Sequence, residues 1–544
     1  MDGILIAFAI ILFFSIPLDI TKFRSLSSLF YQWWRNILHF GTIVAAVLAY
    51  IYMPALIYPD ILVPCGLMLA INASYTLLSS FSPTHNSINT RRAKLPALIM
   101  TLLMVLFIFF SILPLTQSTS LHQLPQAIIE PSVQSSIDTN HIRQVPVEFA
   151  EWKADKVIGD IGYKVTTGQI AVQIIHDRLF WISSLEFESF WKWLQYQESP
   201  GYVLVDAEDP EAKPLLIDKH HFKYLPSAYF SQNLHRKIYR QFPNYRFNDY
   251  ILEIDESGKP WWVASALLPT IGFTGEKIVG VVLVDPESGD VSFHETIPAW
   301  VDRAFPEYLA EQYNFWYGAY IHGFINTMFS QKDMHIPTHL NGIIDVFAVY
   351  SKGELVWFTG HTSPSGSDQS MTGYATINTR TGKMIYYSNV SGYFNEEAAA
   401  SAAESKVSNF EGYHASQPVF YVLEGQPAWI VPILSSNNNL QLLSIVNAET
   451  GQVVLGENLA LALSRFGSKI NLQSAYSAIM EGTIYRLNNG HLLLVGNSTI
   501  FSVSGPLADL SREGDRITLG IISSEPLNDT IKATILKNTN IPQR

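Results

Sequence analysis

The sequence has 544 residues, of which 48% are apolar and 15% are charged, and its mean hydropathy is positive. This length corresponds to roughly three or four domains, and the apolar composition excludes a disordered chain and favours membrane segments. The 35 Lys and Arg against 47 Asp and Glu give a net charge of −12, so nucleic-acid binding is not expected. The single cysteine, Cys65, excludes an internal disulfide and any cysteine-based metal cluster.

Four apolar stretches lie in the first 115 residues, and each is about as long as a helix that crosses a hydrocarbon core. They are Gly3 to Leu18, His39 to Tyr58, Ile61 to Ser80, and Leu95 to Leu115. The basic residues of this region follow the first and third stretches, which the positive-inside rule places in the cytoplasm. We therefore expect a four-span transmembrane domain over residues 1–115, in contact with membrane lipid. The protein would be a multi-pass protein of the plasma membrane, with residues after 115 outside the cytoplasm.

Two segments precede the most informative part of the sequence. Residues 116–144 are rich in Ser, Thr, Gln and Pro and predict a flexible linker. Residues 145–225 predict an α+β segment, with strands at Ile170 to Ile175, Leu179 to Ile182 and Tyr202 to Val205, and a helix at Phe187 to Gln195.

One two-part pattern then recurs three times. Its first part is a glycine with a tryptophan four positions later, which singles out Trp262, Trp357 and Trp429. Its second part is Asp or Asn, two residues, Ser or Thr, and a glycine, which ends at Gly289, Gly382 and Gly451. The Trp-to-glycine spacings are 27, 25 and 22 residues, so the two parts recur together.

Each part of the pattern predicts a β-hairpin. Glycine supplies the positive φ of a tight turn, and an Asp or Asn side chain caps it. The recurring tryptophan is expected at a fixed place on the sheet, as a buried anchor. The alternative is an exposed ring that stacks on carbohydrate.

A helix followed by two such hairpins resembles the PepSY domain. The resemblance covers Ser227 to Glu295 and Asn395 to Glu457, and in part Asp345 to Tyr387. It implies extracytoplasmic modules that bind or restrain a partner protein and carry out no chemistry. The expected boundaries are repeat 1 at 226–297, an aromatic helical segment with hairpin repeat 2 at 298–392, and repeat 3 at 393–465. The aromatic segment, Trp300 to Phe329, is expected to pack on the sheets, and the alternative is that it lies on the outer leaflet of the membrane.

The last part of the chain, residues 470–544, predicts five short strands separated by turn signals. Five strands of this size indicate a small β-barrel, similar to an OB fold, with a structural or protein-docking role. The predicted fold class is therefore α+β, with a transmembrane domain, extracytoplasmic PepSY-like repeats and a C-terminal barrel.

Two motifs resemble sites of chemistry. His335 and His339 are separated by Pro337, which prevents the helix that would present both rings to one zinc ion. The stretch Gly360 to Asp368 holds a histidine, serines and an acid, but it lacks a nucleophile elbow and is interpreted as a loop. The sequence thus predicts no catalytic residue, no cofactor and no metal, and it leaves Trp262, Trp357 and Trp429 as binding or anchor candidates.

The expected function is a non-enzymatic, membrane-anchored, extracytoplasmic scaffold or regulator that binds proteins of a cell-envelope assembly. One alternative is a hydrolase or hydrolase inhibitor that acts on envelope polymers and uses the three tryptophans as a platform. Another is a membrane sensor. Envelope proteins and lipid are the expected partners, nucleic acid is not, and the oligomeric state is left open.

Overall fold

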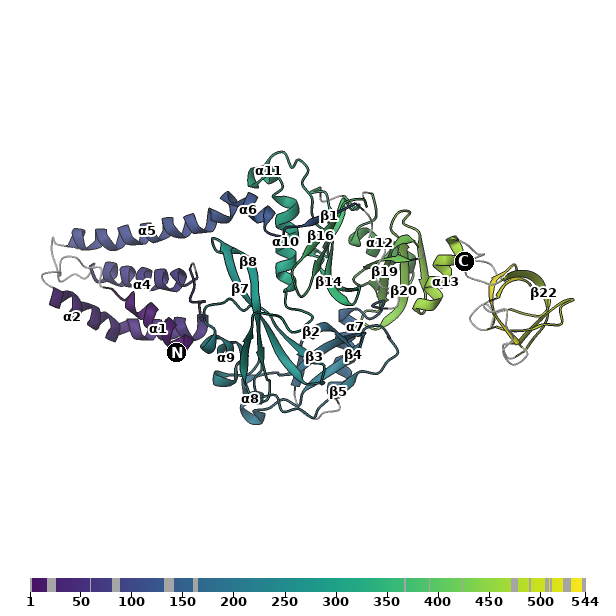
Figure 1. Ribbon diagram of the computed structural model, residues 1–544, viewed down its shortest axis with the longest axis horizontal. Coiled ribbons are helices and arrows are strands. Elements are labelled where there is room, and N and C mark those ends of the chain that lie inside the picture. Colours follow the sequence, from purple (N-terminus) through teal and green to yellow (C-terminus); the bar gives the residue numbers. More distant parts are fainter. Residues whose placement is uncertain are drawn as a thin grey trace. The chain divides into compact units, whose positions relative to one another are not determined.

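The computed structural model describes residues 2–16, 26–58, 60–80, 89–131, 141–159, 165–365, 368–390, 392–423, 425–470, 478–488, 491–503, 508, 511–521 and 530–540 (Figure 1). The chain divides into two compact units. The first is Met1–Leu440 with Ala448–Gly451, and the second is Gln441–Asn447 with Gln452–Arg544.

The first unit begins with a group of helices, purple and blue in Figure 1. They are α1 (Gly3–Phe13), α2 (Leu26–Asn36), η2 (Ile37–Gly41), α3 (Thr42–Val47), η3 (Leu48–Tyr52), α4 (Leu62–Ser80) and α5 (Asn89–Thr116). The Asp2 side chain caps α1 by accepting a hydrogen bond from the Ile4 amide at 2.9 Å. Small side chains, including Ala7, Ala45 and Ala49, are fully buried in the core of this group, so the helices approach closely.

The prediction of a four-helix transmembrane domain is wrong. Within the residues that the structure describes, no helix combines the length and the apolar character needed to cross a membrane. Helix α1 has 11 residues, or about 16 Å at 1.5 Å per residue, against a hydrocarbon core of about 30 Å. The second apolar stretch is divided into η2, α3 and η3 and stops at Met53, which has a left-handed backbone with φ of 45°.

The predicted multi-pass location in the plasma membrane depends on those four spans and is therefore also wrong. The same correction applies to the placement of the remaining chain outside the cytoplasm, because that placement was counted from the number of spans. For the first and second stretches the reason is the helix length, since α1 has 11 residues and the second stretch is divided into shorter elements.

The predicted linker contains regular structure in its described part. Residues of this segment form α6 (Ser118–Gln123) and β1 (Ile128–Glu130), and β1 pairs in parallel with β16 (Met384–Tyr387). These stretches are therefore held in the fold, whereas residues 132–140 of the predicted linker lie outside the described residues.

An antiparallel sheet follows, packed against α7 (Val147–Ile158). Its strands, in spatial order, are β2 (Val165–Ile175), β3 (Arg178–Phe187), β4 (Tyr202–Asp206) and β5 (Leu215–Ile217). Helix α8 (Phe190–Tyr196) connects β3 to β4. The predicted strands at 170–175, 179–182 and 202–205 and the predicted helix at 187–195 overlap these elements.

The next sheet holds the first copy of the sequence pattern. It is antiparallel, in the order β6 (Tyr250–Ile254), β7 (Pro260–Ile271), β8 (Thr274–Val284) and β9 (Val291–His294). It is preceded by η4 (Phe230–Gln232) and α9 (Leu234–Gln241). The Asn233 side chain caps α9 by accepting a hydrogen bond from the Arg236 amide at 3.1 Å.

The sheet of the second copy has six strands. Its four core strands are β13 (Phe347–Ser351), β14 (Glu354–Thr362), β15 (Gly373–Asn378) and β16, and it is extended by β1 and β10 (Ile336–Pro337). The preceding aromatic segment forms α10 (Glu307–Ala319) and α11 (Phe324–Met328). Later in the sequence, β11 (His339–Leu340) and β12 (Ile343–Ile344) form a short antiparallel pair. Tyr313 and Trp316 of α10 are buried in the core, so this helix packs on the sheets as expected.

The third copy begins in the first unit with α12 (Glu396–Val407), β17 (His414–Ala415), β18 (Val419–Leu423) and β19 (Gln426–Leu434). Strand β19 pairs with both β17 and β18 in antiparallel fashion. Asn395 caps α12 by accepting from the Ala398 amide at 2.9 Å.

The second unit starts with the antiparallel pair β20 (Leu440–Asn447) and β21 (Val453–Gly456), followed by α13 (Leu459–Ile470). Five further strands are β22 (Ala478–Asn488), β23 (His491–Leu494), β24 (Ile500–Ser502), β25 (Arg516–Ile521) and β26 (Thr530–Asn538). They pair in the order β22-β23-β24-β26-β25, and β25 pairs back with β22, so the pairings form a closed ring. Leu492, Phe501 and Leu519 are among the buried residues of its core.

Candidate functional site

The three recurring tryptophans are buried and make the same hydrogen bond. Trp262 and Trp357 are 2% exposed and Trp429 is 0% exposed. Each indole N–H donates to the backbone carbonyl of an aromatic residue that precedes the helix of its copy. These pairs are Trp262 with Tyr224 at 2.9 Å, Trp357 with Phe305 at 2.8 Å, and Trp429 with Phe394 at 2.8 Å.

The same aromatic residues also hold the second turn of each copy. Their amides donate to the carbonyls of Pro286, Thr379 and Ala448, at 3.0, 2.7 and 2.7 Å. Their rings cover the turn glycines so closely that an added Cβ would lie 2.4, 2.5 and 2.6 Å from a ring carbon at Gly289, Gly382 and Gly451. One aromatic residue therefore joins both parts of the pattern in each copy, and we call this arrangement the aromatic clamp.

The clamp explains why the two parts of the pattern recur together. It also assigns the tryptophans a structural role, because a ring with no exposed face cannot stack on a polymer at the surface. The interpretation as buried anchors is confirmed by their exposure. The aromatic partners Tyr224, Phe305 and Phe394 were not singled out from the sequence, since they lie 38, 52 and 35 residues before the tryptophans.

Two buried carboxyl groups form a second feature. Glu396 at the start of α12 accepts a hydrogen bond from the Gly360 amide at 2.7 Å through Oε1, and Asp345 accepts from Gln417 at 2.7 Å through Oδ1. Their other oxygens, Glu396 Oε2 and Asp345 Oδ2, are buried and accept no hydrogen bond within the described residues. Burial raises the pKa of both Asp345 and Glu396, and the charge of Asp345 raises that of Glu396 further, so burial favours the protonated form of this pair.

A pair of histidines lies nearby on β14 and before β10. His335 Nδ1 and His361 Nδ1 are 2.8 Å apart, and His361 Nε2 is 2.9 Å from Asn314 Oδ1. Burial lowers the pKa of His335 to about 4 and that of His361 well below its ordinary value, so both rings are neutral. The exposed His339 belongs to β11 and does not join them. Across the described ranges, no three His, Cys, Asp or Glu side chains come together in a way that could hold a metal ion.

The loop that holds a histidine, serines and an acid does not assemble as a triad in its described residues. His361 is fully buried on β14 and bonds to Asn314, whereas Asp368 accepts from Ser370 at 2.6 Å. Residues 366 and 367 lie outside the described residues.

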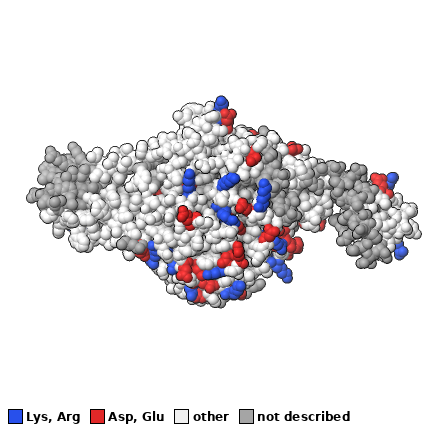
Figure 2. Space-filling model, in the orientation of Figure 1, with Lys and Arg blue, Asp and Glu red and all other residues white. Residues whose placement is uncertain are grey.

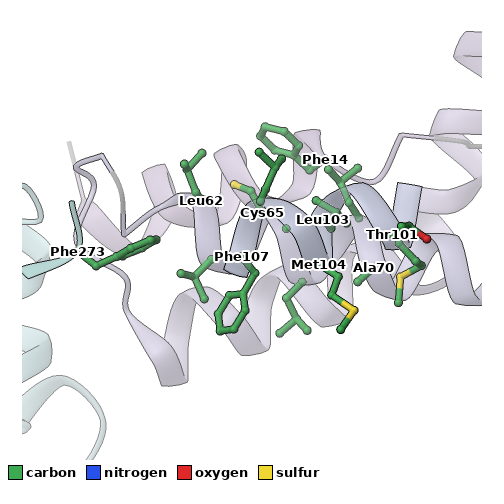
Figure 3. A pocket seen from close by; sticks show the side chains of 15 residues that line it. Phe14, Leu62, Cys65, Ala70, Thr101, Leu103, Met104, Phe107 and Phe273 are labelled. Atoms are coloured by element: carbon green, nitrogen blue, oxygen red, sulfur yellow. The ribbon is translucent and has the colours of Figure 1, made fainter. Parts of the chain in front are cut away.

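An apolar cavity of about 760 Å³ lies between α4 and α5 (Figure 3). Its lining includes Leu62, Cys65, Leu103 and Phe107 from the two helices, together with Phe273 from the turn between β7 and β8. Thr101 contributes the one hydroxyl among the lining residues. Burial raises the pKa of the Cys65 thiol to about 11, so this side chain is neutral and acts as a small apolar residue.

A smaller, polar cavity of about 340 Å³ adjoins it. Arg246 donates to Asp60 through Nε at 2.7 Å and through a second nitrogen, and its Nη1 donates to Glu276 at 2.7 Å. The Tyr308 hydroxyl donates to the other Glu276 oxygen at 2.7 Å. The cavity is also lined by aromatic side chains, namely Tyr52, Tyr239, Tyr245, Phe247 and Phe273.

Helix α5 exposes many large apolar side chains. They are Leu98, Met100, Leu102, Met104, Val105, Leu106, Phe107, Ile108, Phe109 and Ile112. The run from 104 to 109 is continuous and is longer than one helical turn, so apolar side chains emerge on every side of the helix. Figure 2 shows Lys, Arg, Asp and Glu gathered over the sheets, whereas the described surface of the helices in this view has almost none.

Comparisons with known proteins do not assign the chain to a family. No family model and no curated protein matches it. A crystal structure of an ACO/RPE65 chimera is 11% identical, with the match covering 54% of this chain and 50% of that chain at a TM-score of 0.13. A TM-score this low does not establish a shared fold. The PepSY resemblance therefore stays a prediction, and no OB fold is shown.

Proposed function

We propose that this protein is a non-enzymatic scaffold or regulator that binds another protein through the exposed surface of α5. The observation that carries the proposal is the continuous apolar run from Met104 to Phe109. Exposed apolar surface of this extent marks an interaction site in folded proteins, because leaving it in water is unfavourable. A partner with an apolar face would bury these side chains.

The clamped sheets support the same proposal. Each has a buried tryptophan and a turn fixed by an aromatic residue, which makes a rigid frame beside the helices. A rigid frame favours binding because it loses little conformational entropy when the partner associates. The resemblance to PepSY modules, which bind or restrain partner proteins, is consistent with this role.

Site-directed photo-crosslinking in the native cell tests the proposal. A photoreactive phenylalanine analogue would replace Leu102 or Val105 of α5 in one set of variants, and the exposed Glu256 in the turn after β6 in the control. We expect one protein adduct of defined mass from the α5 positions and none from the control. Adducts of equal yield from all three positions, or no protein adduct from α5, would refute the proposal.

A further inference from the structure

The apolar cavity and the polar cavity adjoin, and they share Val63 and Phe273 as lining residues. We propose that together they bind a single-chain amphiphile, with its hydrocarbon tail in the apolar cavity and a cationic ammonium headgroup in the polar cavity. This site shares Met104, Leu106 and Phe107 with the protein-binding surface proposed above. The two proposals are tested separately, because amphiphile binding is measured on the purified chain and partner binding is measured by crosslinking in the cell.

The apolar cavity has the chemistry of a hydrocarbon site. Its lining consists of aliphatic, aromatic and sulfur-containing side chains, apart from Thr101. None of these groups is charged, because burial keeps the Cys65 thiol protonated. A polar ligand would lose its hydration here without compensation, whereas an alkyl chain would not. Figure 3 shows Leu62, Phe107 and Met104 along the length of the cavity, which is consistent with an extended ligand.

The polar cavity has an excess of negative charge. Asp60 and Glu276 face a single guanidinium, that of Arg246. His235 also lines the cavity, and burial together with the charge of Arg236, which is not a lining residue, lowers its pKa, so it stays neutral at pH 7. The formal charge of the lining is therefore −1, which favours a cationic headgroup.

Arg246 is not free to bind an anion. Its Nε and Nη2 donate to Asp60, and its Nη1 donates to Glu276 and to the Phe273 carbonyl at 2.8 Å. An anionic headgroup would have to displace one of these carboxylates. By contrast, an ammonium group would be attracted by the ring quadrupoles of the aromatic side chains that line the cavity, Tyr52 and Tyr239 among them.

Three probes with the same twelve-carbon tail distinguish the headgroups. Dodecyltrimethylammonium, dodecyl sulfate and dodecyl maltoside would each be titrated into the full chain below their micelle concentrations, and binding would be followed by calorimetry. We expect saturable one-to-one binding of the ammonium compound, at least tenfold tighter than that of the sulfate. Equal or tighter binding of the sulfate would overturn the headgroup assignment, and unsaturable binding of all three would overturn the site.

Variants locate the tail. An added Cβ at Gly66 would meet only Leu103 Cδ2, at 3.9 Å, so there is open space to fill. Gly66→Leu is expected to weaken binding of dodecyltrimethylammonium at least tenfold, and Gly66→Ala by less. The matched control is Leu98→Phe, which enlarges an exposed side chain of α5 outside the cavity and is expected to leave affinity unchanged. Unchanged affinity in a folded Gly66→Leu protein would exclude this cavity as the tail site.

A charge variant locates the head. Asp60→Asn changes the formal charge of the polar cavity from −1 to zero, so the preference for ammonium over sulfate should fall at least threefold. The control is Glu256→Gln, which removes an exposed acid in the turn after β6 and should leave the preference unchanged. Circular dichroism would verify that each variant is folded. A preference that is unchanged in folded Asp60→Asn would show that the head lies elsewhere.

Discussion

The clamped sheets bury their recurring large apolar side chains, whereas the N-terminal helices expose many of theirs. In the sheets, Trp262, Trp357 and Trp429 are buried and charged residues cover the surface. In the helices, small residues such as Ala45 and Ala49 are buried, whereas Ile43, Ile51 and Phe107 are exposed. The same apolar composition therefore stabilises the fold in one region and remains available for binding in the other.

This comparison separates the expected effects of substitution. Removing a large side chain from a sheet core costs both its transfer free energy and that of the cavity it leaves. Removing an exposed one costs little stability. Substitutions in the sheets should therefore change folding, and substitutions on the helices should change binding.

The largest expected effect is that of Trp357→Ala. It removes a buried indole and leaves the Phe305 carbonyl without its donor, so the free energy of unfolding should fall by about 3–5 kcal/mol. The matched substitution in the helices, Leu102→Ala, should change it by less than about 0.5 kcal/mol. Urea titrations followed by circular dichroism measure both. Losses of similar size would show that the two regions do not differ as described.

A second effect appears on titration. The pKa of Glu396 is about 8 in the folded protein, against an ordinary 4.5, so the folded state holds a proton that the unfolded state releases. Stability is therefore retained below about pH 5 and is lost as the pH rises toward 8. Asp345, whose pKa is also raised by burial, contributes a loss of the same sign over this range.

Glu396→Gln isolates this contribution, because the amide oxygen can still accept from Gly360 and carries no charge. Urea titrations at pH 6, 7 and 8 should give a weaker pH dependence for this variant than for the unaltered protein. Substituting the exposed Glu397 of the same helix by Gln should leave the dependence unchanged. An equal slope for both variants would count against a buried proton on Glu396.

The clamp itself is tested by two glycines. Gly382 has φ of 71° and lies against the Phe305 ring, whereas Gly353 has φ of 83° and no atom within 4 Å of an added Cβ. Both alanine variants share the cost of a left-handed backbone, about 1–2 kcal/mol. Only Gly382→Ala must also displace the ring, so it should lose about 1 kcal/mol more. If thermal or urea unfolding gave equal losses of stability for the two variants, the Phe305 ring would move aside without a measurable cost.

These features differ in how far the sequence could predict them. The turn glycines and the tryptophans were found because a hairpin turn fixes residue types over a few positions. The partner carbonyls of Tyr224, Phe305 and Phe394 were missed because their distance along the chain varies from copy to copy. Asp345 and Glu396 come from separate elements, and no local pattern joins them.

The helices show the opposite failure. The sequence predicts four apolar spans, but in the second of them the backbone changes to π-helical turns and the helix ends at Met53. Hydropathy averages over a window and does not detect such a change. It also does not tell which apolar side chains face inward, and this distinction separates the two regions of the molecule.

The smallest expected effect concerns the reactivity of a thiol in the helices. Cys65 is 3% exposed, and its pKa of about 11 leaves little thiolate at pH 8. Alkylation by iodoacetamide should therefore be slow. In a Cys65→Ala background, Leu67→Cys would place a thiol two residues further along α4, where the native side chain is 47% exposed, and it should react at least tenfold faster. The two positions lie on the same helix. Equal alkylation rates would therefore mean that α4 does not have one buried face and one exposed face.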